Sequence, residues 1–144
     1  MKPLWACPKC GQTFVTARVW HSCVTVPLGA HFEGKADLLR KTFDKFVSLA
    51  RKNGPVVLRP VKTRIALQAN TRFASVTVRG NDLRCHVVLD HGAARPPVRK
   101  VDKVGNSYVH VFALATPADA DSRVAGLLKA AYAVDRKRHG ARPR

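Results

Sequence analysis

The chain has 144 residues, of which 46% are hydrophobic, and it carries 26 lysines and arginines against 9 aspartates and glutamates, a net charge of +17. This composition excludes a disordered chain and predicts one ordinary domain with a small appendage. No apolar run reaches the length of about eighteen residues that a membrane helix needs, and the N-terminus lacks the apolar stretch of a secretory signal. We therefore expect a cytoplasmic protein with reduced thiols and no membrane contact.

Near the N-terminus, the stretch WACPKCGQTFVTARVWHSC brings together residues that commonly bind metals. The predicted ligands are Cys7, Cys10, His21 and Cys23. Three thiolates and one imidazole at this spacing suit a tetrahedral zinc site, and four protein ligands close it, so the zinc is expected to be structural. Gly11 allows the positive φ of a knuckle turn after Cys10. Residues 1–27 are thus predicted to be a zinc-finger-like segment.

Other interpretations of this segment remain open. Cys7 and Cys10 could be ordinary thiols and His21 a surface residue, or the Cys-x2-Cys pair could be a redox pair. His31 could replace His21 as the fourth ligand. For the zinc interpretation, Phe14 and Trp20 are expected to supply a minimal apolar core, because so short a segment buries too little surface to fold unaided.

After a linker at 24–34, apolar residues at three- and four-residue steps predict a helix over 35–53. Asn53-Gly54-Pro55 is a strong stop signal for it. Six segments then have the alternation or turn signals of strands. They are residues 56–60, 63–69, 72–79, 83–90, 98–104 and 107–114.

The last predicted helix begins with Thr116 as its N-cap, Pro117 as its first residue and Asp119 in a capping-box-like position. An apolar stripe follows as far as Tyr132. The basic residues 135–144 have no apolar periodicity and are expected to form a mobile tail.

Short turns between consecutive strands predict antiparallel pairing, and helices that bracket the strands predict an α+β domain over residues 28–134. We expect an antiparallel sheet of about five strands flanked by two helices and preceded by the small zinc knuckle. The helices should cover one sheet face. The other face is predicted to be partly wet, that is, exposed to solvent, because it carries the polar side chains of Arg64, Gln68, Arg84 and His86.

The positive charge is concentrated in the central region, where residues 35–134 have eighteen basic and seven acidic side chains, a net charge of +11. Such a charge attracts polyanions and favours a nucleic-acid-binding or nucleic-acid-associated module over simple drift of composition. The predicted DNA- or RNA-binding, or anion-binding, residues are Lys62, Arg64, Arg72, Arg84, His86, Lys100, Lys103 and His110.

Two other functions are compatible with the same residues. One is a small-ligand or enzymatic site on the wet sheet face around Lys62, Arg64, His86 and His110. The other is a protein-interaction adaptor that docks through the finger. An enzyme is the less favoured interpretation, because the acidic residues show no convergent pair and no phosphate loop or nucleophile motif occurs. Cys85 is predicted to be a buried strand residue.

The finger stretch and several later segments together resemble the bacterial "domain of unknown function 5655" family with a leading zinc finger. The later segments are HFEGK (31–35), PVKTRIALQ (60–68), RFASV (72–76), SYVHVFAL (107–114) and AYAVD (131–135). The resemblance covers residues 5–135 and implies an α+β domain, a metal-bound N-terminus and an association with nucleic-acid-handling modules. It implies no catalytic residues.

Overall fold

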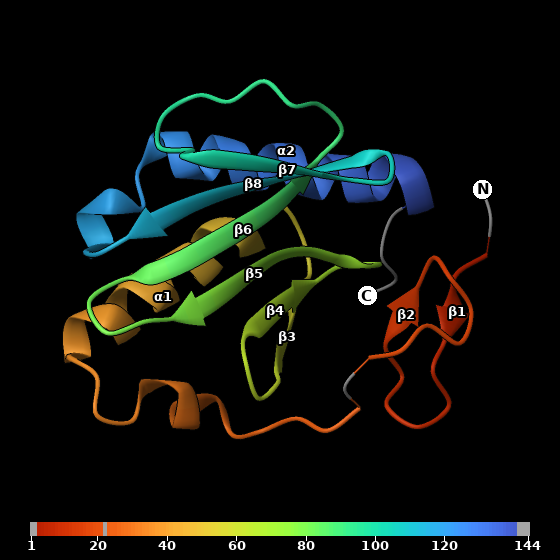
Figure 1. The fold of residues 1–144 in the computed structure, drawn as a ribbon, viewed down its shortest axis with the longest axis horizontal. Coiled ribbons are helices and arrows are strands. Elements are labelled where there is room, and N and C mark those ends of the chain that lie inside the picture. The colour runs from red at the N-terminus through yellow and green to blue at the C-terminus, as the bar shows by residue number, and fades with distance from the viewer. Residues whose placement is uncertain (1–2, 22, 141–144) are drawn as a thin grey trace.

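A computed structural model describes residues 3–21 and 23–140 of the chain (Figure 1). Its main element is a fully antiparallel sheet with the strand order β3-β4-β5-β6-β8-β7. The strands are β3 (Val57–Pro60), β4 (Ile65–Gln68), β5 (Arg72–Val78), β6 (Leu83–Leu89), β7 (Lys100–Val104) and β8 (Ser107–Leu114). The α+β class and the antiparallel pairing are confirmed, with six strands where about five were expected.

Helix α1 (Asp37–Arg51) buries the predicted apolar stripe, including Leu39, Phe43, Phe46 and Ala50. It lies with α2 (Ser122–His139) on one side of the sheet, behind the strands in the view of Figure 1. The core fills the space between the two helices and this sheet face. Neither helix is both long and apolar enough to cross a membrane.

The predicted start of the last helix is wrong, because α2 begins at Ser122 and not at Pro117. Thr116 and Asp119 do form a capping box, but it encloses only the short 3-10 helix η2 (Pro117–Asp119). The chain then turns, and the Asp121 carboxylate accepts hydrogen bonds from the backbone N–H groups of residues 123 and 124 as the N-cap of α2. A second acidic cap therefore marks the real helix start.

The expected tail also differs from the structure over residues 135–139, which continue α2. Asp135 is the reason, because its carboxylate is only 3% exposed and is hydrogen-bonded to the β4–β5 turn. This contact holds the last turns of the helix on the domain. Residues 141–144 of the predicted tail lie outside the described residues.

The sheet face opposite the helices is called the open face below. In β6, Leu83, Val87 and Leu89 are buried against the helices together with Cys85, for which burial was predicted. The alternate residues therefore point to the open face. A bulge at β4–β5 places Phe73 as an extra residue between the pairs Leu67–Ala74 and Gln68–Arg72.

The N-terminal finger contains a two-stranded sheet of β1 (Trp5–Ala6) and β2 (Thr13–Phe14). It is hydrogen-bonded to one end of the main sheet, where the Thr13 hydroxyl donates to the Asn70 carbonyl and accepts from Gln68 Nε2. The Arg72 guanidinium lies 5.4 Å from the centre of the Phe14 ring, within range of a cation–π contact. A short 3-10 helix, η1 (Leu28–Phe32), lies between the finger and α1.

Candidate metal centre and basic sheet face

The predicted metal ligands come together at one point of the finger. One ligand atom from each of Cys7, Cys10, His21 and Cys23 lies within 4.8 Å of the others. Cys7 Sγ is 3.7 Å from Cys23 Sγ, and His21 Nε2 is 3.3 Å from the sulfurs of Cys10 and Cys23. All four cysteines of the chain, including Cys85, are free thiols. The donor atoms are thus close enough to share one metal ion.

The backbone around the first two cysteines explains this arrangement. Gly11 has a φ of +74° and donates its N–H to the Cys7 carbonyl over 2.8 Å, which closes the knuckle turn. Burial raises the pKa of the Cys10 thiol, but hydrogen bonds with the backbone and side chain of Gln12, and then with His21 and Cys7, together lower that pKa to about 6. The turn therefore favours the thiolate, which is the form that binds metal.

His21 is held in the orientation that presents Nε2 to the sulfurs. Its Nδ1–H donates to the Val19 carbonyl over 2.8 Å, and its ring packs on Phe14 with centroids 4.4 Å apart. Such a partner on the second nitrogen is usual for a metal-binding histidine. His31 lies instead in η1 and is not part of this group.

The expected apolar core of the finger is only half correct. Phe14 packs against Trp5 and His21, with the Trp5 and Phe14 ring centres 6.2 Å apart. Trp20, however, is 90% exposed and contributes nothing to that core. Trp5 takes its place because the pairing of β1 with β2 puts it directly opposite Phe14.

Most of the predicted basic residues do lie on the open face. Cross-strand pairing places Arg84 beside Thr77 and Ala113, and His86 beside Ser75 and Val111. Arg64 and Arg72 line a hollow on this face together with His86, and Lys100 lies on it beside Val111. Lys62 is exposed in the β3–β4 turn next to Arg64.

Two of the predicted nucleic-acid-binding residues point away from the open face, and one residue of the expected wet face is covered. His110 is fully buried opposite Val87, on the helix side, and its Nε2 donates to the His91 carbonyl over 2.8 Å. Lys103 pairs with Tyr108 and so points to the same side as His110. Gln68 is 5% exposed, because the finger covers it. The first two errors follow from the register of β7 and β8, which alternation within one strand does not fix.

Arg59 is an additional basic residue of the open face that sequence reasoning missed. It pairs with Ala66, which itself pairs with Ser75 of that face. Burial lowers the pKa of Arg72, and the positive charges of Arg64 and Arg59 lower it further. These guanidinium groups therefore lie close enough to repel one another. The alternation of side chains in VVLRP (56–60) could have indicated this placement, but so short a strand does not show which of its faces points to the core.

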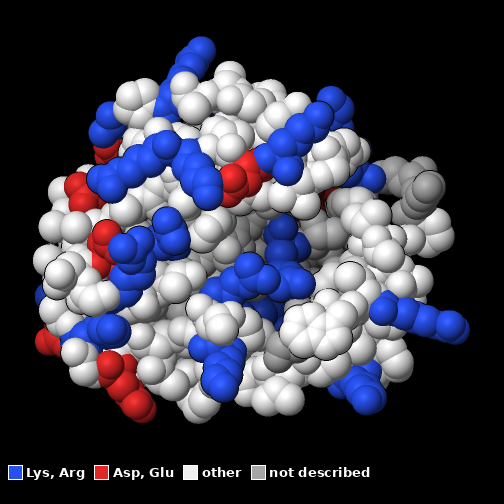
Figure 2. All heavy atoms as spheres, in the orientation of Figure 1, with Lys and Arg blue, Asp and Glu red and all other residues white. Residues whose placement is uncertain are grey.

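Figure 2 views the open face and shows Lys and Arg side chains around and within a central hollow. Within residues 3–21 and 23–140, none of Arg59, Arg64, Arg72 and Arg84 forms a salt bridge. Lys100 does pair with Asp102 over 3.4 Å. The face thus carries a cluster of four arginines that no acidic side chain in the described part of the chain pairs with.

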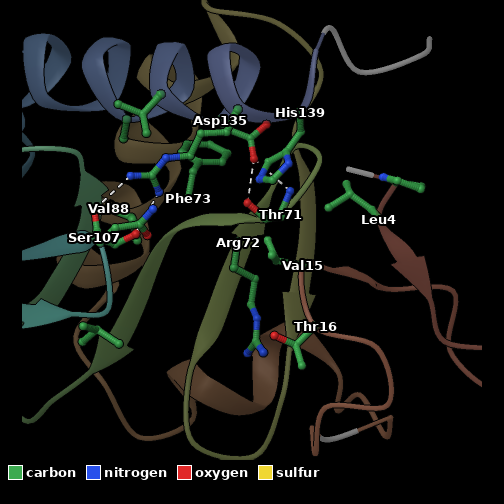
Figure 3. Close-up of a pocket in the computed structure, with 16 residues that line it drawn as sticks. Leu4, Val15, Thr16, Thr71, Arg72, Phe73, Val88, Ser107, Asp135 and His139 are labelled. Atoms are coloured by element: carbon green, nitrogen blue, oxygen red, sulfur yellow. Dashed lines mark hydrogen bonds between the residues drawn. The ribbon is translucent and has the colours of Figure 1, made fainter. Parts of the chain in front are cut away.

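A second concavity of about 600 Å³ lies between the finger, the start of β5 and the end of α2 (Figure 3). On its inner wall Asp135 is hydrogen-bonded to Thr71, and Arg138 donates to the Ser107 hydroxyl over 2.8 Å. Figure 3 shows the Arg72 side chain turned away from Asp135 toward Thr16 of the finger. Arg72 lines both this cleft and the hollow of the open face, so the two concavities adjoin.

Apart from the finger cluster, no group of three or more metal-binding side chains converges within residues 3–21 and 23–140. Cys85 is fully buried, and burial raises the pKa of its thiol, which disfavours the nucleophilic thiolate.

Comparisons with curated proteins and with solved structures give no match. A family model described as "Domain of unknown function (DUF5655)" matches residues 28–135. The match spans η1 to the buried Asp135 and leaves the finger outside, so the resemblance holds for the main domain but not over the whole of residues 5–135. Because the match covers most of the chain, this protein belongs to the DUF5655 family.

Proposed function

We propose that this protein is a non-catalytic nucleic-acid-binding module, in which a structural zinc ion organises the finger and the open face contacts phosphate groups. The observation that carries the proposal is the unneutralised set of arginines on one sheet face. The second concavity extends this surface, because Arg138 and His139 line it beside Arg72. Phosphate contacts from such a surface give strong, salt-dependent binding with little reading of sequence.

Zinc is the metal that the donor set favours. Three sulfurs and one imidazole nitrogen leave no position for water or substrate, so the ion would hold the finger together without taking part in a reaction. Purified protein should contain about one zinc per chain by elemental analysis, the stoichiometry of a single closed site. Cys10→Ser should lose it, whereas Cys85→Ala should keep it, because Cys85 lies outside the cluster.

Nucleic-acid binding is tested by titrating labelled duplex and single-stranded oligonucleotides at about 50 and 300 mM salt, a range over which counterion release changes affinity strongly. We expect binding at the lower concentration and a large loss at the higher one. The double variant Arg64→Gln/Arg84→Gln removes two exposed charges from the open face. Its charge-matched control, Lys129→Gln/Arg136→Gln, changes exposed residues of α2 instead.

The absence of binding by the wild-type protein at the lower salt concentration would exclude the proposal. Equal losses in the two double variants would show that only net charge matters and not the open face.

A protein-interaction adaptor is the second candidate, and one observation favours it. The finger exposes Val15, Trp20 and Val24, which are 61%, 90% and 74% exposed. Exposed apolar residues of this kind are common at protein interfaces. A complex that survives nuclease treatment and high salt would support this function, and its loss under those conditions would support nucleic-acid binding.

A further inference from the structure

The hollow of the open face has a defined shape and composition. Its volume is about 190 Å³, and it lies over β5, β6 and β8, with Arg64 of the turn before β4 at its edge. Its lining residues are Arg64, Arg72, Ala74, Ser75, His86, Val88 and Val109. None of them is acidic. Drug-sized ligands need about 300–1,000 Å³, so this hollow suits a single small group.

The polar groups of the hollow can all donate hydrogen bonds. Arg64 comes from the turn, Arg72 and Ser75 from β5, and His86 from β6 directly opposite Ser75. The β5 bulge next to Arg72 lets Phe73 and Ala74 both be buried while Arg72 lines the hollow. Two elements and a turn therefore bring guanidinium, hydroxyl and imidazole groups to one point.

Two buried nitrogens in this region have no hydrogen-bond partner among the described residues. They are His86 Nδ1 and Arg59 Nε. Buried polar atoms of folded proteins are normally paired, so such exceptions indicate an unmet partner. An acceptor oxygen that entered the hollow would be in reach of the His86 ring and would also lie near the cluster of arginines.

The electrostatics also favour an anion. Burial, followed by the charges of Arg84 and Arg64, lowers the pKa of His86 below its usual value. Burial and the neighbouring arginines thus disfavour a positive charge on the His86 ring. A bound dianion would relieve this repulsion and would itself be desolvated between several positive groups, where charge-assisted hydrogen bonds are strongest.

We propose that the hollow binds a terminal phosphate of a nucleic acid strand, an inference that rests on the proposed function and specifies its ligand. A phosphomonoester carries a charge of about −1.5 to −2 and three acceptor oxygens, whereas a phosphodiester inside a strand carries one charge and two free oxygens. Only a monoester can insert one end into a hollow, because both sides of a diester are attached to sugars. From the hollow, the rest of the nucleic acid strand would pass Arg72 and Val88 and enter the adjoining cleft, which both residues also line.

The first test compares one oligonucleotide in three forms, with a 5′-phosphate, with a 3′-phosphate and with hydroxyl groups at both ends. We expect one phosphorylated form to bind about tenfold more tightly than the unphosphorylated form, the effect of one charge-assisted contact. Arg64→Gln should remove this preference without unfolding the protein, because Arg64 is exposed. Arg136→Gln is its matched control on α2 and should retain the preference.

A second test uses inorganic phosphate alone, with NMR detection of the His86 imidazole and the arginine Nε–H signals. Saturable shifts confined to the hollow, and absent from Ser75→Ala/Arg64→Gln, would support the proposal. Equal binding of all three oligonucleotides would overturn it while leaving the proposed function intact. Saturable phosphate binding without binding of any oligonucleotide would instead exclude the proposed function and the strand as ligand, leaving only the phosphate specificity of the hollow.

Discussion

Replacement of Asp135 by alanine should destabilise the fold far more than its position near the C-terminus suggests. The carboxylate is 3% exposed and accepts four hydrogen bonds, from the backbone N–H and the side chain of both Asn70 and Thr71. Their donor–acceptor distances lie between 2.7 and 3.1 Å. These bonds join the end of α2 to the β4–β5 turn, beside the finger contact at Asn70.

The expected loss follows from the groups left behind. Alanine leaves the two backbone N–H groups and the Thr71 hydroxyl without their acceptor, whereas Asn70 Nδ2 keeps its bond to the Gly140 carbonyl. An unsatisfied buried donor costs about 1–3 kcal/mol. Some donors can reach water once the carboxylate is gone, so we expect Asp135→Ala to lower the free energy of unfolding by about 3–5 kcal/mol. Asp135→Asn should cost about 2 kcal/mol or more, because its NH₂ group would face a donor.

Urea unfolding monitored by circular dichroism measures these values. Asp44→Ala is the control, because the Asp44 carboxylate is exposed in its ion pair with Arg40, and we expect this change to alter stability by less than about 1 kcal/mol. A loss of under about 1 kcal/mol in Asp135→Ala would refute the view that this carboxylate holds the helix end on the sheet.

Three further predictions concern the finger, the open face and the core. Cys10→Ser, or removal of metal with a chelator, should abolish the amide-exchange protection of the finger but leave that of the main sheet; loss of both would contradict a finger that only docks on the domain. The NMR-determined pKa of His86 should lie below 6.5 and rise with added phosphate, because burial and the nearby arginines disfavour the charged ring. His86 is therefore neutral at pH 7, and its contribution to folding stability, fully present above pH 6.5, is lost as the pH falls through the lowered pKa. A pKa above 6.5 without phosphate would disprove the placement of the arginines. Gly54→Ala should lower the free energy of unfolding by about 1–3 kcal/mol, because Gly54 has a φ of +146° and the new Cβ would lie 2.5 Å from the Tyr132 hydroxyl oxygen. An unchanged free energy of unfolding would show that this turn adjusts freely.

The sequence predicted those features that depend on local patterns. The apolar stripe of α1 and the alternation of β6 gave the correct buried faces, because each residue's direction in these elements follows from the helical or strand period. The ligand spacing gave the finger cluster, because a knuckle and a short return segment bring those side chains together with few possible geometries.

Features that depend on pairing between distant segments were not predictable in the same way. His110 was assigned to the wet face, but its orientation is set by pairing with Val87, twenty-three residues earlier in the chain. Asp135 was predicted to be the first residue of a tail, because nothing near it in the sequence indicates that it accepts hydrogen bonds from the β4–β5 turn. The bulge that turns Arg72 to the open face also left no clear signal in the sequence.

The central claim, that the open face contacts phosphates, is tested most directly by the salt dependence of nucleic-acid binding. The logarithm of the association constant is plotted against the logarithm of salt concentration for the wild type and the two charge-matched double variants. Each lost phosphate contact should reduce the slope by about 0.9, so Arg64→Gln/Arg84→Gln should reduce it by about 2, whereas Lys129→Gln/Arg136→Gln should not change it. An unchanged slope in the open-face variant would contradict the claim.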